Sequence, residues 1–257
     1  MLYNIQSYIK YKLNAKNQHS VHSPFVYDLV TQCFYDKTTY TDYSRFSTYR
    51  NYLLQSDETI EVTDLGEGGK TQRTQKRNVR DIMKIAASPK KAQNLMYRLI
   101  RHLDIASILE LGTSLGNATY AMALANPSAK ITTIEGCPNI SRYTSQNLKN
   151  RDIKNVEFLT GDFNSVFHEL NQTTFDLIFF DGNHNEKATI NYFETLLERS
   201  NNDSVFIFDD IYWSRGMTRA WNYIKAHPKV TVSIDIFFWG IVFFRKEQAK
   251  EHFKIRL

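Results

Sequence analysis

Cysteines are few in this sequence, and long apolar runs are missing from it. Only two of its 257 residues are cysteines, Cys33 and Cys137, which argues against the disulfide framework of small secreted domains and favours a reducing compartment. No apolar run reaches the ~18 residues that a membrane-spanning helix needs, and the N-terminus lacks the apolar core of a signal peptide. We therefore expect a cytoplasmic protein without a membrane partner.

The composition is that of a folded chain with a large core. Hydrophobic residues make up 42% of the sequence and aromatic residues 14%, which is enough to fill a sizeable interior. A chain of 257 residues is long for one domain and short for two full ones. One large domain with an extension is the expected organisation.

Positive charge is concentrated in one segment. Between Lys70 and Lys91 there are eight Lys or Arg residues and a single acid, Asp81, whereas the whole chain has a net charge of +5. A basic face of this kind can attract nucleic acid, phosphorylated substrates or anionic lipid. The alternative, which we favour, is a solvated helix and loop.

The first 87 residues are predicted to form a mainly helical N-terminal extension. Leu2, Ile5, Ile9 and Leu13 recur at helical spacing. Ser23-Pro24 is a typical helix start, with a hydroxyl cap before a proline in the first turn. The tyrosine-rich residues 35–52 show no regular pattern, and no convincing series of buried strands precedes residue 104.

From Ala106 onward short apolar runs alternate with helical stretches, which is typical of a parallel α/β sheet with crossover helices. The chain ends in "VTVSIDIFFWGIVFFR", which predicts an antiparallel hairpin with a tight turn near Gly240. The predicted strands before this hairpin are Ser107–Leu111, Lys130–Glu135, Val156–Thr160, Phe175–Asp181 and Ser204–Asp209.

Glycines follow the predicted strands closely. Gly112, Gly116, Gly136, Gly161 and Gly182 each lie within a few residues of a strand end. In open α/β sheets ligands bind outside the carboxyl ends of the strands, where the backbone must approach them closely. We therefore expect a ligand along this edge.

Three acids at successive strand ends suggest the kind of ligand. Gly112 and Gly116 are four residues apart, unlike a dinucleotide G-x-G-x-x-G, and the acidic Glu110 beside them suits a cationic ligand. Glu135, at the end of the next strand, is placed to accept two hydrogen bonds from a ribose diol. Asp162 follows the third strand and can accept from an exocyclic amine.

These residues resemble a known family. "ILELGTSLGNATYAMA", "ITTIEGCP" and "GDF" are similar to the cofactor motifs of class I S-adenosylmethionine-dependent methyltransferases, and residues 88–257 most resemble the O-methyltransferase branch of the catechol and caffeoyl-CoA type. The resemblance implies a Rossmann-like seven-stranded sheet of order 3-2-1-4-5-7-6 with the last strand antiparallel. Residues 1–87 are more similar to the N-terminal part of Bacteroidetes methyltransferases. The resemblance implies cofactor contacts at Glu110, Gly112, Thr113, Ser114, Gly116, Asn117, Glu135, Gly136, Asp162, Phe163 and Asp181.

The stretch "FDLIFFDGNH" is the candidate catalytic segment. In the metal-dependent O-methyltransferases an aspartate ends the fourth strand and a basic catalytic residue, usually lysine, follows three positions later; these positions are Asp181 and His184 here. Asp209 and Asp210 end the fifth strand, where the branch has an Asp-Asn metal pair. The three carboxylates would repel one another unless a hard cation such as Mg²⁺ or Mn²⁺ joined them. The resemblance thus implies a metal at Asp181, Asp209 and Asp210, with His184 as base.

Alternatives remain open at this point. The "DG-x-H" segment serves without a metal in related families, or Asp181 only N-caps the following helix and His184 is an exposed first-turn residue. For the whole chain we favour methyl transfer to a hydroxyl of a small molecule. The competing functions are an RNA hydroxyl methyltransferase that uses the basic segment 70–91, and a non-enzymatic S-adenosylmethionine-binding protein. A homodimer is compatible with each of them.

Overall fold

The structure is a computed structural model, and it describes residues 2–64, 73–86 and 89–257. The chain forms two compact units: Asp36–Leu170, here called the central unit, and Met1–Tyr35 together with Asn171–Leu257, here called the terminal unit. This division differs from the sequence-predicted boundary at residue 87. Within the described residues, no helix has the length and apolar character that crossing a bilayer requires.

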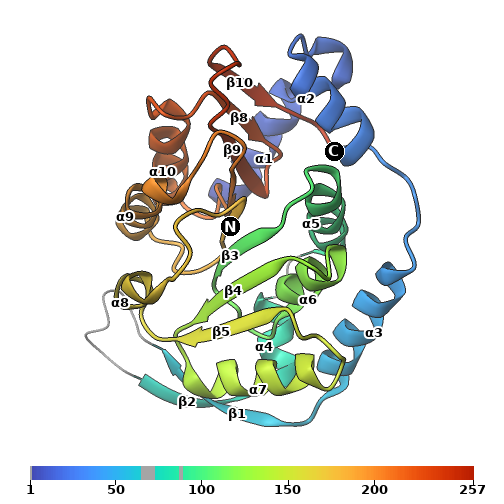
Figure 1. The fold of residues 1–257 in the computed structure, drawn as a ribbon, viewed down its shortest axis with the longest axis vertical. Helices are drawn as coiled ribbons and strands as arrows, with labels where there is room; N and C mark the ends of the chain where they lie inside the picture. The colour runs from blue at the N-terminus through green and yellow to red at the C-terminus, as the bar shows by residue number, and fades with distance from the viewer. Residues whose placement is uncertain (1, 65–72, 87–88) are drawn as a thin grey trace. The chain divides into compact units, whose positions relative to one another are not determined.

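The central unit contains a three-stranded parallel sheet with helices beside it (Figure 1). Strand β4 lies between β3 and β5, which is the predicted 3-2-1 order. Helix α7 packs against β4 and β5 and also contacts the hairpin strand β1. The elements of this unit are α3 (Asp42–Gln55), β1 (Thr59–Asp64), β2 (Arg73–Asn78), α4 (Val79–Ala86), α5 (Lys90–His102), β3 (Ser107–Leu111), α6 (Asn117–Ala125), β4 (Lys130–Glu135), α7 (Pro138–Lys149), β5 (Val156–Thr160) and α8 (Phe163–Val166).

Two elements of the central unit differ from the sequence prediction. Most of the tyrosine-rich segment, predicted to be irregular, forms helix α3, which buries Tyr43, Phe46, Tyr49 and Leu53 at spacings of three, three and four residues. The antiparallel hairpin of β1 and β2 was not predicted.

The terminal unit contains strands in the order β6-β7-β9-β8-β10. β6 and β7 are parallel, and β9 runs antiparallel to both β7 and β8, as the predicted order 4-5-7-6 requires. β10 pairs with β8 and is one strand more than the seven predicted. The elements of this unit are α1 (Leu2–Asn14), α2 (Pro24–Asp28), β6 (Leu177–Phe180), α9 (Glu186–Leu196), β7 (Val205–Asp209), α10 (Arg215–Ala226), β8 (Val232–Asp235), β9 (Trp239–Phe243) and β10 (Glu251–Lys254). The chain therefore has the predicted α/β Rossmann-like fold.

The turn of the terminal hairpin was predicted at the wrong residue. Gly240 lies inside β9, and the chain turns at residues 236–238 instead. A Cβ on Gly240 would lie 2.6 Å from ring carbons of Trp221, so the glycine allows the indole to pack on the strand. Phe237 takes the turn conformation with φ 77°, which is rare for a bulky residue.

The N-terminal segment belongs to the terminal unit through contacts with the end of the chain. The Tyr11 hydroxyl donates a hydrogen bond to the carbonyl of Ile255, and the Lys16 amide donates to the carbonyl of Lys254 at 2.8 Å. Lys16 and Ile255 also form a parallel β-bridge. These contacts explain why residues before Tyr35 do not form an extension of their own.

Candidate functional site

The glycine-rich loop after β3 has the backbone that its sequence predicts. Gly112 and Gly116 have φ angles of 102° and 71°, in the left-handed region that favours glycine. At Gly116 a Cβ would lie 2.5 Å from Cγ2 of Thr144, so a side chain there would displace α7. Ser114 between them has φ 46°. The backbone of this loop can therefore come close to a ligand that binds beyond the end of β3.

Glu110 lies in β3 and is fully buried rather than exposed in the loop. Its Oε2 accepts hydrogen bonds from the hydroxyls of Thr119 and Thr133, both at 2.6 Å. Its Oε1, and both side-chain polar atoms of Asn117, are buried without a hydrogen-bond partner among the described residues. Buried polar groups normally have partners. These atoms are therefore a place where a polar ligand fits.

Glu135 connects the ends of β4 and β3. Its Oε2 accepts from the Ser114 amide at 2.8 Å and its Oε1 from the Cys137 amide at 2.9 Å. Because a carboxylate oxygen has a second lone pair, each can accept one more hydrogen bond. Burial raises the pKa of Glu135, and the hydrogen bond from the Cys137 amide opposes this increase. The side chain is thus held in place with capacity for a diol.

Asp162 and Phe163 follow β5, as predicted. The Oδ1 of Asp162 accepts from the Asn164 amide at 3.0 Å and caps the short helix α8, of which Phe163 is the first residue. Gly161 precedes them with φ 154°. Together with Gly136, these residues complete the set of predicted cofactor positions in the central unit.

Glu110 gives a pH prediction for the ligand-free protein. Burial raises its pKa to about 7, against the hydrogen bonds from Thr119 and Thr133. The folded state therefore binds the proton of the Glu110 carboxyl more tightly than the unfolded state does. The stabilisation that results is complete below the unfolded pKa of 4.5 and is lost as pH rises through about 7. Glu110→Gln should remove this pH dependence. At pH 8 its free energy of unfolding should be about 3 kcal/mol higher than that of the wild type.

The measurement is denaturant unfolding of both proteins between pH 4.5 and pH 8. Glu157→Gln, which changes an exposed acid of β5 in the same unit, is the control and should leave the slope unchanged. Parallel pH profiles for wild type and Glu110→Gln would reject the raised pKa.

A second group of polar side chains lies in the terminal unit. Phe180 and Phe208 are register partners of the parallel strands β6 and β7. The residues that follow them, Asp181 and Asp209, therefore stand side by side where the two strands end. This is the arrangement that the sequence predicts for the candidate catalytic acids.

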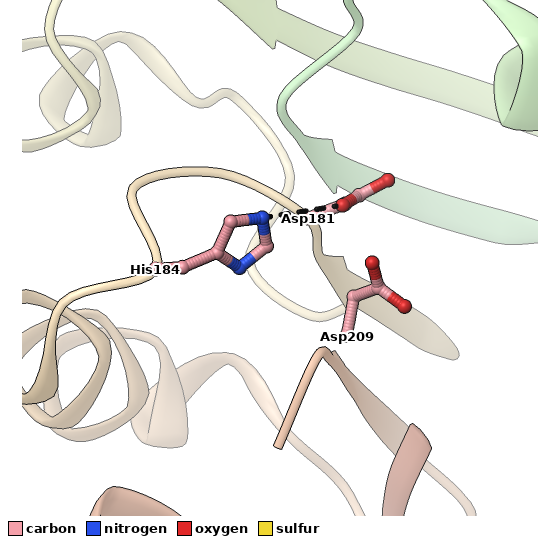
Figure 2. Close-up of side chains that lie close together, drawn as sticks. All are labelled: Asp181, His184 and Asp209. Atoms are coloured by element: carbon pink, nitrogen blue, oxygen red, sulfur yellow. Dashed lines mark ion pairs between the residues drawn. The ribbon is translucent and has the colours of Figure 1, made fainter. Parts of the chain in front are cut away.

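His184 completes this group (Figure 2). Its Nε2 lies 3.9 Å from Oδ1 of Asp181, and one ligand atom from each of Asp181, His184 and Asp209 lies within 4.8 Å of the other two. The imidazole reaches toward the carboxylates from the loop after β6, as Figure 2 shows. Two oxygens and one ring nitrogen are a ligand set that Mn²⁺ and similar divalent cations accept. We call these three residues the acid–histidine group.

Burial shifts the proton affinities in this group. It raises the pKa of Asp209 to about 7, and the negative charge of Asp210 adds to the increase. It lowers the pKa of His184, while the charge of Asp210 opposes this change. A neutral imidazole beside buried carboxyl groups can accept a proton near pH 7.

Asp210 lies outside the three residues whose ligand atoms converge. It has φ 52°, and its amide donates a hydrogen bond to the carbonyl of Phe238 at 2.9 Å. The three-residue metal set implied by the resemblance contained Asp210, and the structure brings His184 together with Asp181 and Asp209 instead. Asp210 acts on His184 through its charge.

The alternative in which Asp181 caps the following helix is wrong. The N-cap of α9 is Asn185, whose Oδ1 accepts from the amides of Lys187 and Ala188 at 3.0 and 3.3 Å. Asn183, with φ 51°, turns the loop between the strand and this cap. Asp181 is therefore not needed to begin the helix.

One residue near the acid–histidine group was not among the predicted site residues. Trp213 is 62% exposed, and its ring centre lies 6.4 Å from that of His184. The sequence predicts that it lies in the core or in a pocket wall, and its position four residues after the strand-ending Asp209 was the available signal for the site.

The basic segment 70–91 is only partly described, because residues 70–72 and 87–88 lie outside the described residues. Two of its cations form salt bridges: Arg80 lies 3.4 Å from Asp57 and Lys84 lies 3.5 Å from Asp81. Lys76, Arg77, Lys90 and Lys91 are exposed. These features agree with a solvated surface.

Comparison with known proteins gives a consistent picture. Residues 109–211 match a family model described as a methyltransferase domain. A putative caffeoyl-CoA O-methyltransferase from Staphylococcus aureus aligns with a TM-score of 0.57 and 20% identity over 65% of this chain and 90% of its own. An S-adenosylhomocysteine-bound methyltransferase from Podospora anserina aligns with a TM-score of 0.61 and 13% identity over 88% and 97% of the two chains.

A third similar structure is an O-methyltransferase of tomaymycin synthesis from Streptomyces achromogenes, solved in complex with S-adenosylmethionine. It aligns with a TM-score of 0.55 and 19% identity over 62% of this chain and 82% of its own. No curated protein matches the chain. At these identities the structural neighbours establish a shared fold. Residues 109–211 therefore match a methyltransferase domain model, in a chain that shares its fold with O-methyltransferases of solved structure.

Proposed function

We propose that this protein transfers a methyl group from S-adenosylmethionine to a hydroxyl oxygen of a small-molecule acceptor. The observation that carries the proposal is the acid–histidine group at the ends of β6 and β7, since it supplies a base of the kind that such a transfer needs. The methyltransferase domain match supports the reaction class.

The central unit would bind the cofactor. Glu135 has acceptor capacity for the ribose diol, and the left-handed backbone at Gly112 and Gly116 allows close approach of the chain. The unpartnered oxygen of Glu110 and the unpartnered amide of Asn117 suit the charged amino acid end. When bound, S-adenosylmethionine supplies an activated methyl group on a sulfonium.

His184 would remove the proton of the acceptor hydroxyl. Methyl transfer is an in-line displacement, so the protein's tasks are to orient the oxygen and to take up its proton. The lowered pKa leaves His184 neutral at pH 7, with a ring nitrogen free to accept. The negative charge of Asp210 stabilises the imidazolium that forms.

The two carboxylates of the same group, Asp181 and Asp209, would hold a divalent cation such as Mg²⁺ or Mn²⁺, since a ligand atom of each lies within 4.8 Å of the other. His184 would then stay uncoordinated, so that its ring nitrogen can take up the proton. Such a cation would lower the pKa of a coordinated hydroxyl. Its positive charge would also favour the ionised form of Asp209, whose pKa is raised by burial.

The test has two stages. Isothermal titration should detect binding of S-adenosylmethionine and S-adenosylhomocysteine and none of NAD(H). A methyl-transfer screen should then find turnover with hydroxylated small molecules and little with RNA, and metal-stripped enzyme should regain its rate with Mn²⁺ or Mg²⁺. Cofactor binding without transfer to any hydroxyl would favour a non-enzymatic S-adenosylmethionine-binding protein. Equal rates with and without EDTA would reject the cation.

A further inference from the structure

A cavity of about 440 Å³ opens on the central unit between residues 36–47 and one face of α5. None of the residues proposed for the cofactor lines it. Its size is within the usual range for small-molecule sites, roughly 300–1,000 Å³. The lining contains no aliphatic side chain, and its single aromatic one, Tyr43, presents a hydroxyl. A ligand of this cavity must therefore be small and polar.

The charged residues that line the cavity are mainly positive. Lys37, Lys90 and Arg98 face one acid, Asp36. Among the described residues, neither lysine forms a salt bridge, and both are exposed at the cavity mouth. The three cations leave a net positive charge that an anion would neutralise.

The acid in the lining already has hydrogen-bond donors of its own. The Oδ1 of Asp36 accepts from the Thr38 amide at 2.7 Å and its Oδ2 from the Tyr40 hydroxyl at 2.8 Å. These bonds hold the carboxylate in the turn that leads to α3. Asp36 is thus fixed by the protein, and its single negative charge, which interacts with Arg98, offsets only one of the three cations.

Three of the lining residues share one face of α5. Lys90, Asn94 and Arg98 are spaced four residues apart, so their side chains lie in a row along the helix. Arg98 donates from its Nη1 to the Tyr43 hydroxyl at 3.2 Å, which orients the guanidinium. The Oδ1 of Asn94 is buried and has no hydrogen-bond partner among the described residues. The row therefore brings two cations, Lys90 and Arg98, to the same side of the cavity.

We propose that this cavity binds a phosphomonoester, the phosphate group of a small soluble molecule or of a lipid headgroup. A guanidinium binds phosphate oxygens in pairs, and ammonium groups add point charges around them. The hydroxyls of Thr38 and Thr39 stand at the same cavity for the remaining contacts. This site is separate from the proposed methyl transfer and does not depend on it.

The experiment is isothermal titration with inorganic phosphate and with glycerol 3-phosphate, at constant ionic strength. The test variant is the double substitution Lys37→Gln/Lys90→Gln, and Lys91→Gln is the matched control because that exposed lysine is next to Lys90 on α5 and does not line the cavity. We expect binding to wild type and to the control, and at least tenfold weaker binding to the double variant. Arg98→Lys keeps the charge and loses the paired donors. Its affinity for phosphate should lie between those of the wild type and the double variant.

Sedimentation with vesicles of phosphatidylcholine, with and without phosphatidic acid, separates the two sources of the phosphate. Binding to phosphatidic acid that the double variant loses would assign the site to a headgroup, and loss of glycerol 3-phosphate binding alone would assign it to a soluble ligand. Equally weakened binding in the double variant and in Lys91→Gln would show that the attraction is due to general surface charge and would overturn the proposal. The absence of detectable binding of inorganic phosphate, glycerol 3-phosphate and phosphatidic acid vesicles would overturn it as well. S-adenosylhomocysteine affinity should be unchanged in the double variant, which shows that it is folded.

Discussion

His184→Gln should slow methyl transfer by roughly 10²–10⁴-fold, the usual loss when a general base is removed. Glutamine fills a similar volume and keeps a polar end but cannot take up the proton. The melting temperature should change little, because the imidazole is partly exposed and caps no helix. Single-turnover rates and thermal unfolding of the same preparations measure the two effects separately.

The control for this variant is His168→Gln, which changes an exposed histidine of the central unit and should keep the wild-type rate. Asp209→Asn should also slow turnover, and it should weaken the dependence on Mg²⁺ or Mn²⁺ if the acid–histidine group holds the cation. A rate for His184→Gln within a few-fold of wild type would exclude His184 as the base. Since cofactor binding is assigned to the central unit, S-adenosylmethionine affinity should be unchanged in both variants.

Glu135→Ala should weaken S-adenosylmethionine binding by about two to four orders of magnitude, since it removes two charge-assisted hydrogen bonds worth ~1.5–3 kcal/mol each. The same change releases the Ser114 and Cys137 amides, which Glu135 now holds at 2.8 and 2.9 Å. Glu135→Gln keeps an acceptor for one of these amides and loses the charge, so its affinity should be intermediate. Isothermal titration of each variant measures the loss.

Glu157→Ala is the matched control for the cofactor variants, because it removes an exposed acid from β5 of the same unit. It should bind the cofactor like wild type. Wild-type affinity in Glu135→Ala, or a preference of the wild type for NAD(H), would refute the cofactor assignment.

The parts of the fold that could be predicted are those where burial leaves a regular pattern. The β6 and β7 segments are continuous apolar runs because they are buried on both faces, and their abrupt ends locate Asp181 and Asp209. Helix α3 was missed because three of its four buried residues are aromatic and five of its other residues are Ser, Thr, Asp or Asn, which are weak helix formers, so packing must stabilise the helix. The β1–β2 hairpin was missed because its second strand, "RTQKRN", has no apolar residue.

The candidate site was predictable in its residue types and less so in its geometry. Asp209 and Asp210 are neighbours in sequence, and nothing in the sequence says which of them faces Asp181. The backbone decides it: Asp210 takes φ 52° and hydrogen-bonds to Phe238, which leaves Asp209 in line with the strand. His184 could be named as a base from its spacing, but its place among the metal-ligand candidates depends on the loop conformation at Asn183.

The terminal unit combines a segment before the central unit with a segment after it. This arrangement constrains the order in which the protein can fold during synthesis. The central unit is one continuous stretch, so all of its contacts are available once residue 170 has left the ribosome. Tyr11 and Lys16 are made before the central unit, yet their partners Ile255 and Lys254 are made after it. Closing a loop of this length costs conformational entropy that only contacts formed after β10 is made can offset. We therefore expect residues 2–35 to stay without their final packing until β10 has been translated, and refolding of the terminal unit to be the slower phase.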